Sequence, residues 1–454
     1  MILSHRLGLI CALGALVGCA PKAPAQNQVP PAKLVAQQAP TTFVEATKKL
    51  DDIGDYPAII AAAGEWEKAH PTDAQGPFYE ARARYYNGDF AGAIAAWERS
   101  KVVNPSFAAN ADQWLALAHK YQAKWGEQAP LQLADSDLEN ARDAARAQAQ
   151  PLLRAGKYDE IERVAAQLAQ SKAMTADGDW LLVHFFRGLA STDDGATEAD
   201  WEAQRALIEN WRKARPQSAL ARAALAKCWI SGAWLARGSK YASEVSPQAW
   251  EQVEARINKM GEVLDKGGDI PAQIKSSPLF FDVLQSWALL SGLPTEDYDA
   301  LFEVATGAHP QAAMFWTSAA FRLLPRWHGE PGEWEEFALS EANRVAKTQG
   351  QSAGDVLYAR MVWQMMLSSF RYQNIWEKST AEWPRAQRGM KLLLEQYPDS
   401  LGAQTVYFEM AFRAEDWEDA RAMLKKMKGK VNAQYYSNSR EAFAKRRVFV
   451  LDNK

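Results

Sequence analysis

Two short markers recur with one spacing near the start of this 454-residue chain. The first is a tight turn, Gly54-Asp55-Tyr56, which returns as Gly88-Asp89-Phe90. The second is a proline after a helical stretch, Pro71, which returns as Pro105. Positions 54 and 88 are 34 residues apart, and so are positions 71 and 105. Because glycine permits a tight turn and proline ends a helix, the chain is expected to fold as consecutive helical pairs.

The same two markers appear along the rest of the chain at wider intervals. Turns of this kind stand at Gly156-Lys157-Tyr158 and Glu415-Asp416-Trp417, and helix-ending prolines stand at Pro216, Pro310 and Pro398. Apolar residues return at three- and four-residue spacing, and long alternating runs of Val, Ile and Thr are missing, which favours helices over strands. We therefore predict an all-α solenoid, with helices of variable length in its middle and a bend near residues 266–278.

Residues 74–107 give the best copy of the repeat. Ala81, the turn at Gly88, Ala93, Trp97 and Pro105 form a pattern that resembles the tetratricopeptide repeat. The resemblance implies a right-handed superhelix of helical hairpins, with an extended concave surface of the kind that binds partner proteins. The copy departs from the family pattern at Pro77, Glu80 and Arg84, where apolar or aromatic residues are usual.

The first nineteen residues have the form of an export signal. A basic start ending at Arg6 precedes the apolar run 7–17, whose 11 residues are too few to cross a bilayer as a helix and suit a signal peptide. The run ends in Leu16-Val17-Gly18-Cys19, which resembles the lipobox of bacterial lipoproteins. The resemblance implies a signal peptide over 1–18 and acylation of the Cys19 thiol. An ordinary secretory signal with a chance cysteine is the alternative.

Residues 19–41 are expected to form a disordered tether behind the lipid. Five prolines and almost no charge stand between Ala20 and Thr42, a composition that cannot build a core. About twenty such residues span roughly 25 Å if they are flexible. Lipoproteins retained in the inner membrane carry Asp after the cysteine, whereas this chain has Ala20. The resemblance therefore implies a lipid anchor in the outer membrane, with the body facing the periplasm.

Composition excludes several other classes of protein. A formal net charge of −3 gives no electrostatic support for nucleic-acid binding, and three cysteines with six histidines argue against a disulfide framework or several zinc sites. Phosphate-loop, zinc-protease, nucleophile-elbow and calcium-loop motifs are missing. We therefore predict no catalytic residues, no cofactor and no metal site. Cys228, the only thiol left after processing, is expected to be a buried structural residue.

A second resemblance lies at residues 321–338. Pro325-Arg326-Trp327-His328-Gly329 is followed by a helix containing Trp334, and this arrangement resembles a motif of uncharacterised bacterial repeat proteins that carry a domain of unknown function. We expect one helix to end before Pro325 and the next to begin at Pro331. Packing of Trp327 and Trp334 across the turn is the first interpretation. A recognition surface that uses Arg326, Trp327 and Trp334 is the second.

The end of the chain is locally basic, with 11 basic and 6 acidic residues from Arg413 to Lys454. A polar terminal helix that caps the solenoid is one interpretation. Contact with anionic lipid or an acidic partner is the other, and its candidate residues are Lys425, Lys426, Lys428, Lys430, Arg446 and Arg447.

These observations predict N-terminal helical repeats over 42–265 and C-terminal helical repeats with a basic terminal helix over 266–454. The predicted function is a membrane-anchored, non-catalytic scaffold or adaptor that binds an unidentified protein or peptide. A module for envelope polysaccharide or peptidoglycan is the alternative, because the chain's 18 tryptophans would provide stacking platforms if they were exposed. An enzyme with a site in the irregular middle is the third and least favoured hypothesis.

Overall fold

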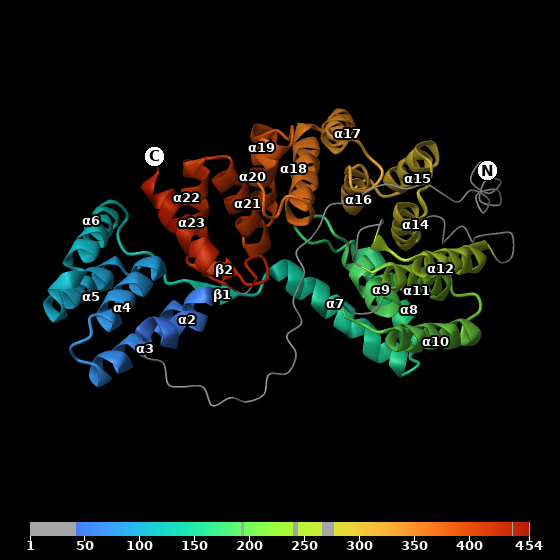
Figure 1. Ribbon diagram of the computed structural model, residues 1–454. Helices are drawn as coiled ribbons and strands as arrows, with labels where there is room; N and C mark the ends of the chain where they lie inside the picture. Colours follow the sequence, from blue (N-terminus) through green and yellow to red (C-terminus); the bar gives the residue numbers. More distant parts are fainter. Residues whose placement is uncertain (1–41, 192–194, 239–243, 266–276, 438, 454) are drawn as a thin grey trace. The chain divides into compact units, whose positions relative to one another are not determined.

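The computed structural model describes residues 42–191, 195–238, 244–265, 277–437 and 439–453. These residues form an all-α solenoid of 21 α-helices packed side by side, with two strands of three residues each (Figure 1). The all-α prediction is confirmed. The signal peptide, Cys19 and the tether lie outside the described residues, and so does most of the expected bend, because residues 266–276 are not described.

The chain divides into two compact units. The internal unit comprises the described residues between 140 and 389, and the terminal unit comprises residues 42–139 together with 390–453. The terminal unit therefore joins segments from both ends of the sequence. Both limits between the units fall inside helices, α7 (Asp137–Arg154) and α20 (Trp383–Gln396). The sequence-based boundary at 265/266 adjoins residues outside the described part.

The terminal unit begins with paired helices and ends with three more. Its helices are α2 (Phe43–Ile53), α3 (Tyr56–Ala69), α4 (Gln75–Asn87), α5 (Phe90–Val103), α6 (Ala108–Trp125), α21 (Leu401–Arg413), α22 (Trp417–Met427) and α23 (Glu441–Asp452), with a 3₁₀ turn at Pro105–Phe107. The strands β1 (Gln132–Ala134) and β2 (Lys430–Asn432) pair in parallel, with Leu133 opposite Val431.

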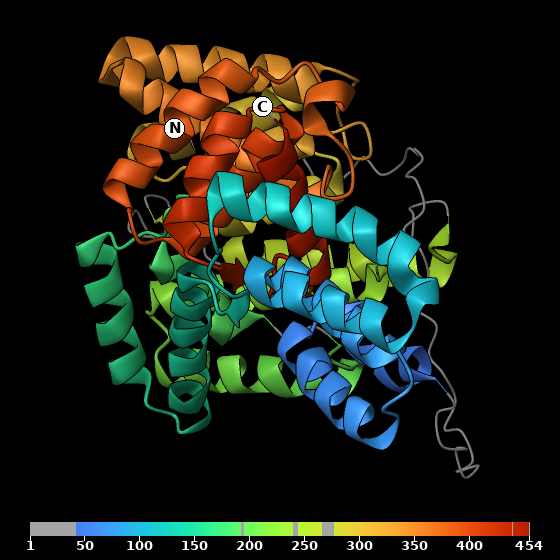
Figure 2. The same cartoon turned by 90° about the vertical axis from the view of Figure 1, so that its left-hand side faces the viewer.

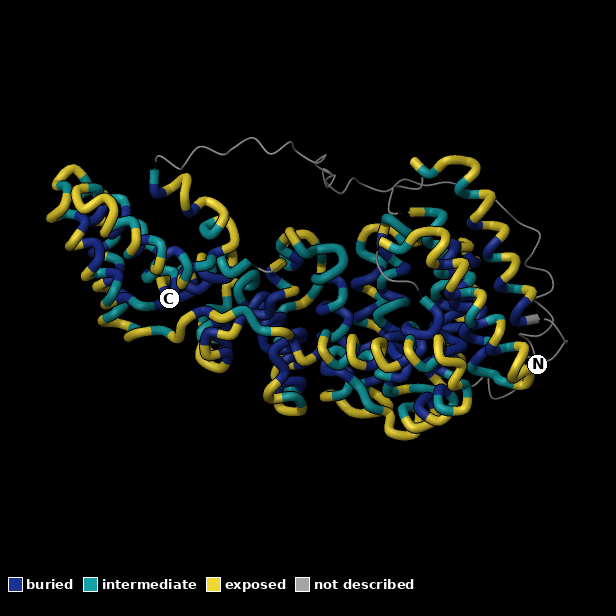
Figure 3. Tube along the Cα trace, turned by 90° about the horizontal axis from the view of Figure 1, so that it is seen from below, coloured by how far each residue is buried: buried dark blue, intermediate teal, exposed yellow. Residues whose placement is uncertain are grey.

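The internal unit holds most of the remaining helices. They are α8 (Tyr158–Ser171), α9 (Leu181–Ala190), α10 (Glu198–Ala214), α11 (Ala219–Arg237), α12 (Pro247–Asp265), α14 (Pro278–Ser291), α15 (Thr295–Ala308), α16 (Met314–Arg322), α17 (Glu333–Gln349), α18 (Gln351–Ser368) and α19 (Ile375–Lys378). Within each unit, buried residues follow the sides of the helices that contact neighbouring helices, and exposed residues follow the outer sides (Figure 3).

The predicted turns and stops are confirmed. Gly54 and Gly88 end α2 and α4 with φ of 67° and 91°, a left-handed conformation that glycine adopts without strain. Asp55 and Asp89 then cap the next helices, because each carboxylate accepts a hydrogen bond from a backbone N–H three residues later. Each predicted helix end is also found, because a helix stops two residues before each of the five prolines. The helices are α3, α5, α10, α15 and α20, and the prolines are Pro71, Pro105, Pro216, Pro310 and Pro398, in the same order.

Two departures from the repeat pattern compensate each other. Glu80 is almost fully buried in α4, where an apolar residue is usual. Its carboxylate accepts hydrogen bonds from Arg84 at 2.6 Å and from Arg99 on α5 at 2.5 Å. Because a buried carboxylate is tolerated when its charge is paired and its oxygens are hydrogen-bonded, Arg84 replaces the usual aromatic residue without leaving Glu80 unpaired.

The last helix closes the terminal unit. Helix α23 packs on α2, α4 and α6, and Figures 1 and 2 both place it beside the N-terminal helices. Arg447 of α23 donates hydrogen bonds to the backbone oxygens of Tyr86 and Ala129. Trp125 at the end of α6 donates its indole N–H to the Leu451 oxygen at 2.8 Å. Residues from both ends of the chain thus share one core.

The tryptophans contribute mainly to packing. Those that are buried are Trp97, Trp180, Trp201, Trp211, Trp316, Trp334 and Trp363. The others are only partly exposed, including Trp229, Trp234, Trp250 and Trp287. In the part of the chain that the structure describes, no tryptophan therefore stands fully exposed as a stacking platform. No helix among these residues is both long and apolar enough to cross a membrane.

Candidate peptide-binding groove

A groove of about 350 Å³ lies in the terminal unit between α2, α3 and α4. This volume falls within the range of clefts that hold small ligands or the side chains of a bound peptide, roughly 300–1,000 Å³. The residues that line it are Val44, Thr47, Lys48, Asp51, Asp52, Tyr56, Ile59, Tyr79, Arg82 and Ala83.

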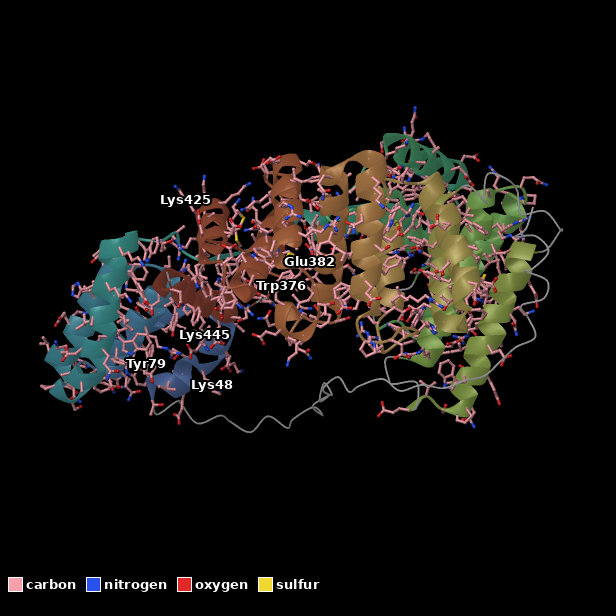
Figure 4. All side chains as sticks on the ribbon, turned by 90° about the horizontal axis from the view of Figure 1, so that it is seen from above. Lys48, Tyr79, Trp376, Glu382, Lys425 and Lys445 are labelled. Carbon is pink, nitrogen blue, oxygen red and sulfur yellow. The ribbon has the colours of Figure 1, made fainter. Side chains whose placement is uncertain are left out.

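Helical spacing explains why these side chains converge. On α2, Val44, Thr47, Lys48 and Asp51 stand at positions i, i+3, i+4 and i+7, which share one face of a helix. On α4, Tyr79, Arg82 and Ala83 repeat the first three of these positions. The left-handed turn at Gly54 joins α2 to α3, and α4 packs on both helices, so the two faces border one groove. Figure 4 labels Lys48 and Tyr79, one on each of these helices.

The floor of the groove is apolar. Tyr56, Ile59, Thr47 and Ala83 are buried, whereas Val44 stands at the rim with 43% of its surface exposed. Thr47 donates its hydroxyl to the Phe43 oxygen at 2.9 Å, so this side chain lines the cavity without an unsatisfied donor. Burial also raises the pKa of Tyr56, and its phenol therefore stays neutral. Such a floor favours an apolar side chain of a ligand.

Charged side chains border this floor in opposite-sign pairs. Lys48 lies 3.3 Å from Asp52 on the same helix, and Arg82 lies 3.3 Å from Asp51 across the groove. The Arg82 guanidinium also lies 5.9 Å from the ring centres of both Tyr79 and Tyr86. Exposed ion pairs of this kind contribute little to stability. They can therefore exchange partners with the charged and backbone groups of a bound peptide at small cost.

The sequence did not predict this groove, although Tyr56, which lines it, belongs to the first repeat turn. The available signal was the combination of Val44, Lys48 and Asp51 on one face of the first helix with Tyr79 and Arg82 on one face of the third. Helical periodicity alone does not distinguish such a groove from an ordinary solvated face, because charged residues normally cover exposed helix surfaces.

The sequence-predicted lipidation site, Leu16, Val17, Gly18 and Cys19, lies outside the described residues. The other predicted residues are described. Pro331 does not begin the second helix of the 321–338 motif, because Gly332 occupies the cap position and α17 begins at Glu333. The first helix of the motif, α16, ends at Arg322, before Pro325 as expected.

The residues of this motif take part in internal packing. Trp334 is 2% exposed and contacts the Phe370 ring, so it is not accessible to a partner. Trp327 is half-buried, and its ring contacts are with Trp234 and Phe321. The interpretation in which Trp327 and Trp334 pack on each other is therefore not supported by the ring contacts of the described residues. Arg326 donates a hydrogen bond to the Ser369 hydroxyl at 3.1 Å.

A steric requirement explains the glycine that ends the Pro-Arg-Trp-x-Gly motif. A Cβ atom at Gly329 would lie 2.0 Å from the Leu323 carbonyl oxygen, far inside van der Waals contact. The chain therefore returns so closely on the end of α16 that only glycine fits. This packing role accounts for the motif without a ligand.

The predicted basic residues at the end of the chain fall into two groups. Lys425, Lys426, Lys428 and Lys430 are exposed. Arg446 pairs with the fully buried Glu409 at 3.1 Å, and Arg447 is 3% exposed, with its pKa lowered to about 10 by burial. The prediction that Arg447 contacts an anionic surface is therefore wrong, because its guanidinium is buried inside the terminal unit. Arg446 is partly exposed and pairs with Glu409, and its contact with such a surface stays a prediction.

A buried ionic network lies in the internal unit. Asp282 on α14 is 2.8 Å from both Arg187 on α9 and Lys227 on α11. Asp179, just before α9, accepts a hydrogen bond from Arg142 at 2.9 Å and lies 3.1 Å from the His184 ring. Burial would raise the pKa of Asp282, but Lys227 and Arg187 outweigh it and hold the pKa below its usual value. The network therefore joins α9, α11 and α14 through Asp282, while burial lowers the pKa of Lys227 despite the nearby carboxylate.

Neither the network nor the only described thiol offers reactive chemistry. Burial lowers the pKa of His184, so the ring is neutral near pH 7. Because only 2% of its surface is exposed, solvent has little access to the ring. Burial also raises the pKa of the Cys228 thiol to about 12, so this cysteine stays protonated, as expected for a structural residue. Among the residues that the structure describes, no group of His, Cys, Asp and Glu side chains could hold a metal ion.

A comparison with protein families finds a match inside the internal unit. Residues 145–264 match a family described as a domain of unknown function (DUF4034). The expectation of such a domain is confirmed, although the matched segment does not include residues 321–338. The segment does include Asp179, His184 and Lys227 of the buried network. A search of curated proteins finds no match.

Proposed function

We propose that this protein is a lipid-anchored envelope protein that acts as a non-catalytic scaffold and binds a peptide segment of another protein in the groove between α2 and α4. The observation that carries the proposal is the groove itself, with its apolar floor, exposed Val44 and exchangeable ion pairs. An extended peptide fits this combination because one side chain can be buried while the backbone and charges meet polar groups at the rim.

The alternative, a polysaccharide or peptidoglycan module, receives less support. Sugar rings stack on exposed aromatic faces, and the described tryptophans are buried or only partly exposed. The peptide proposal needs no such platform.

Position 44 provides the test of the groove. A photo-crosslinking amino acid placed at Val44 in the full-length protein should capture a peptide from envelope extract, and mass spectrometry should identify the captured segment. The matched control is the same amino acid at Val102, an 84% exposed valine on α5 of the same unit and outside the groove. Equal capture at both positions would mean that the contact is non-specific.

The identified segment should then bind the purified protein in a fluorescence-anisotropy titration. Val44→Asp should weaken this binding at least tenfold, about 1.4 kcal/mol, because it places a charge against the apolar side chain of the ligand. Val102→Asp should leave the Kd unchanged. An unchanged Kd for Val44→Asp would place the binding site elsewhere, and retention on purified sacculi without any protein partner would favour the polysaccharide module.

Cys19 provides the test of the anchor. The native protein should fractionate with outer membranes and carry the mass of several acyl chains, because one chain alone gives only marginal attachment. Cys19→Ala should remove the added mass, since the acylated thiol is lost. Intact-mass measurement and membrane fractionation of both proteins check this result. A native protein that is soluble and carries no lipid would contradict the anchor while leaving the groove proposal intact.

A further inference from the structure

The surface at the end of α22 carries four neighbouring lysines without carboxylate partners. Lys425, Lys426, Lys428 and Lys430 are exposed, and no ion pair joins them to an acidic side chain of the described residues. Lys48, Lys68 and Lys445 each pair with a carboxylate in their own helix. Lys49, Lys213 and Lys347 are also exposed and have no ion pair among the described residues, but they stand singly, whereas the four at the end of α22 lie within six positions of one another. Figure 4 shows Lys425 on the outside of the terminal unit.

The basic character extends along one side of α22. Arg421 and Lys425 stand at positions i and i+4, so they share a helix face, and Lys428 follows at the C-cap, where the backbone is left-handed. Arg421 is held in place because it donates hydrogen bonds to the backbone oxygens of Val450, at 3.4 Å, and Asn453, at 2.9 Å. Its guanidinium lies 5.5 Å from the centre of the Trp125 ring, and the Lys124 ammonium lies 4.6 Å from the same ring.

An aromatic cluster adjoins this basic stripe. Trp417, at the start of the same helix, lies 5.5 Å from Phe449 and 6.0 Å from Phe412, measured between ring centres. Phe449 is 51% exposed, which is unusual for a phenylalanine in this protein. Trp417 stands one turn before Arg421, so the aromatic cluster and the stripe occupy adjoining parts of one surface.

Two of the nearby acidic groups are engaged elsewhere, whereas Glu415 and Glu418 are exposed and have no ion pair among the described residues. Asp419 lies 2.9 Å from Lys391 and also accepts the Tyr407 hydroxyl. Asp452 pairs with Lys120. The four lysines outnumber the two free carboxylates of Glu415 and Glu418, so the surface keeps a net positive charge, although the whole chain has a formal net charge of −3.

We propose that this surface, formed by Phe449, Trp417, Arg421 and the four lysines, binds the face of an anionic phospholipid bilayer. Several lysine ammonium groups on flexible side chains suit the diffuse charge of lipid phosphates better than they suit one fixed acidic group. The exposed Phe449 and the partly exposed Trp417 beside them suit the interface between headgroups and acyl chains. The lipid anchor proposed above decides only which membrane this surface meets in the cell. Binding to an anionic bilayer as such does not rest on the anchor.

Vesicle binding tests this surface without the anchor. The full-length Cys19→Ala chain should cosediment with vesicles of phosphatidylcholine and phosphatidylglycerol more strongly than with vesicles of phosphatidylcholine alone, and salt should weaken the preference. The fourfold variant Lys425→Gln, Lys426→Gln, Lys428→Gln and Lys430→Gln should lose at least tenfold in affinity for the anionic vesicles. Each lysine near such a surface contributes about a fivefold effect at most.

The control variant replaces Lys48, Lys68, Lys259 and Lys445 by glutamine. These lysines are exposed, each pairs with a carboxylate, and the change in net charge is the same. It should keep the vesicle affinity, whereas Phe449→Ser should reduce it severalfold. Circular dichroism of all variants checks that they are folded.

Two outcomes would overturn the proposal. One is equal binding to neutral and anionic vesicles, even if the surface then binds an acidic protein. The other is an equal loss of affinity in the fourfold variant and its control, which would indicate a response to net charge alone. Val44→Asp should leave vesicle binding unchanged, so a failure of the peptide groove and a failure of this surface give different results.

Discussion

Asp282→Asn is expected to lower the free energy of unfolding of the internal unit by about 3–5 kcal/mol, because it removes the counterion of the buried Lys227 ammonium and one of the two carboxylates near Arg187. Asp282 is 4% exposed and lies 2.8 Å from both Lys227 and Arg187. The asparagine has nearly the same shape as the aspartate, so the effect measures charge and not a cavity. Urea unfolding followed by circular dichroism, with hydrogen exchange to locate the change within residues 140–389, provides the measurement.

The control is Asp159→Asn. Asp159 pairs with Arg215 at 2.8 Å, but its side chain is 81% exposed, so the loss should stay within about 1 kcal/mol. Similar losses in the two variants would mean that the buried network contributes no more than a surface ion pair.

The stability of the native protein and that of Asp282→Asn should depend differently on pH in acid. The pKa of Asp282 is lower in the folded chain than its unfolded value of about 3.9. Its contribution is therefore fully present above that value and is lost as the pH falls through the folded pKa. The stability difference between the native protein and Asp282→Asn should be constant near neutral pH and shrink below about pH 4. A difference that grows in acid would contradict this assignment.

Trp97→Ala is expected to destabilise the terminal unit by about 3–5 kcal/mol through loss of packing. Trp97 is fully buried on α5, and its ring centre lies 5.7 Å from that of Trp114 on α6 and 5.8 Å from that of Tyr85 on α4. Its indole N–H has no hydrogen-bond partner among the described residues, so the loss does not include a broken hydrogen bond. Chemical unfolding and hydrogen exchange of α4, α5 and α6 provide the measurement.

Two further variants separate packing from other effects. Trp97→Phe keeps an aromatic ring and should cost clearly less than Trp97→Ala, because a smaller cavity remains. Val102→Ala, on the exposed side of the same helix, should change stability by no more than about 0.5 kcal/mol. If Trp97→Ala were as mild as Val102→Ala, α5 would not be anchored by this side chain.

Local signals predicted much of this fold. The Gly54 and Gly88 turns and the helix ends before Pro71 and Pro105 could be read from the sequence, because backbone conformation at glycine and proline depends mainly on the residue itself. The buried Glu80 could not be explained in this way. Its tolerance depends on Arg99, a residue 19 positions away that only the folded pair of helices brings into contact.

Long-range contacts decided the rest. Arg446 and Arg447 belong to a run of basic residues that resembles a solvated surface, yet Glu409 and the oxygens of Tyr86 and Ala129 engage them. The candidate groove also depends on the separation of α2 and α4, which periodicity does not give. Sequence patterns specify helix faces, whereas the depth between two faces follows from tertiary packing.

The composition of the terminal unit has a consequence for how the protein is made. Helices α2 to α6 leave the ribosome first, but α21, α22 and α23, which complete their unit, follow only after residues 140–389. The early helices must therefore wait with incompletely covered apolar faces while roughly 250 further residues are synthesised, the kind of intermediate that aggregates or recruits chaperones. In a chain that stops early, the internal unit could be complete while the N-terminal helices remain without their partners. Correct folding of the N-terminal helices thus depends on synthesis of the last helix, α23.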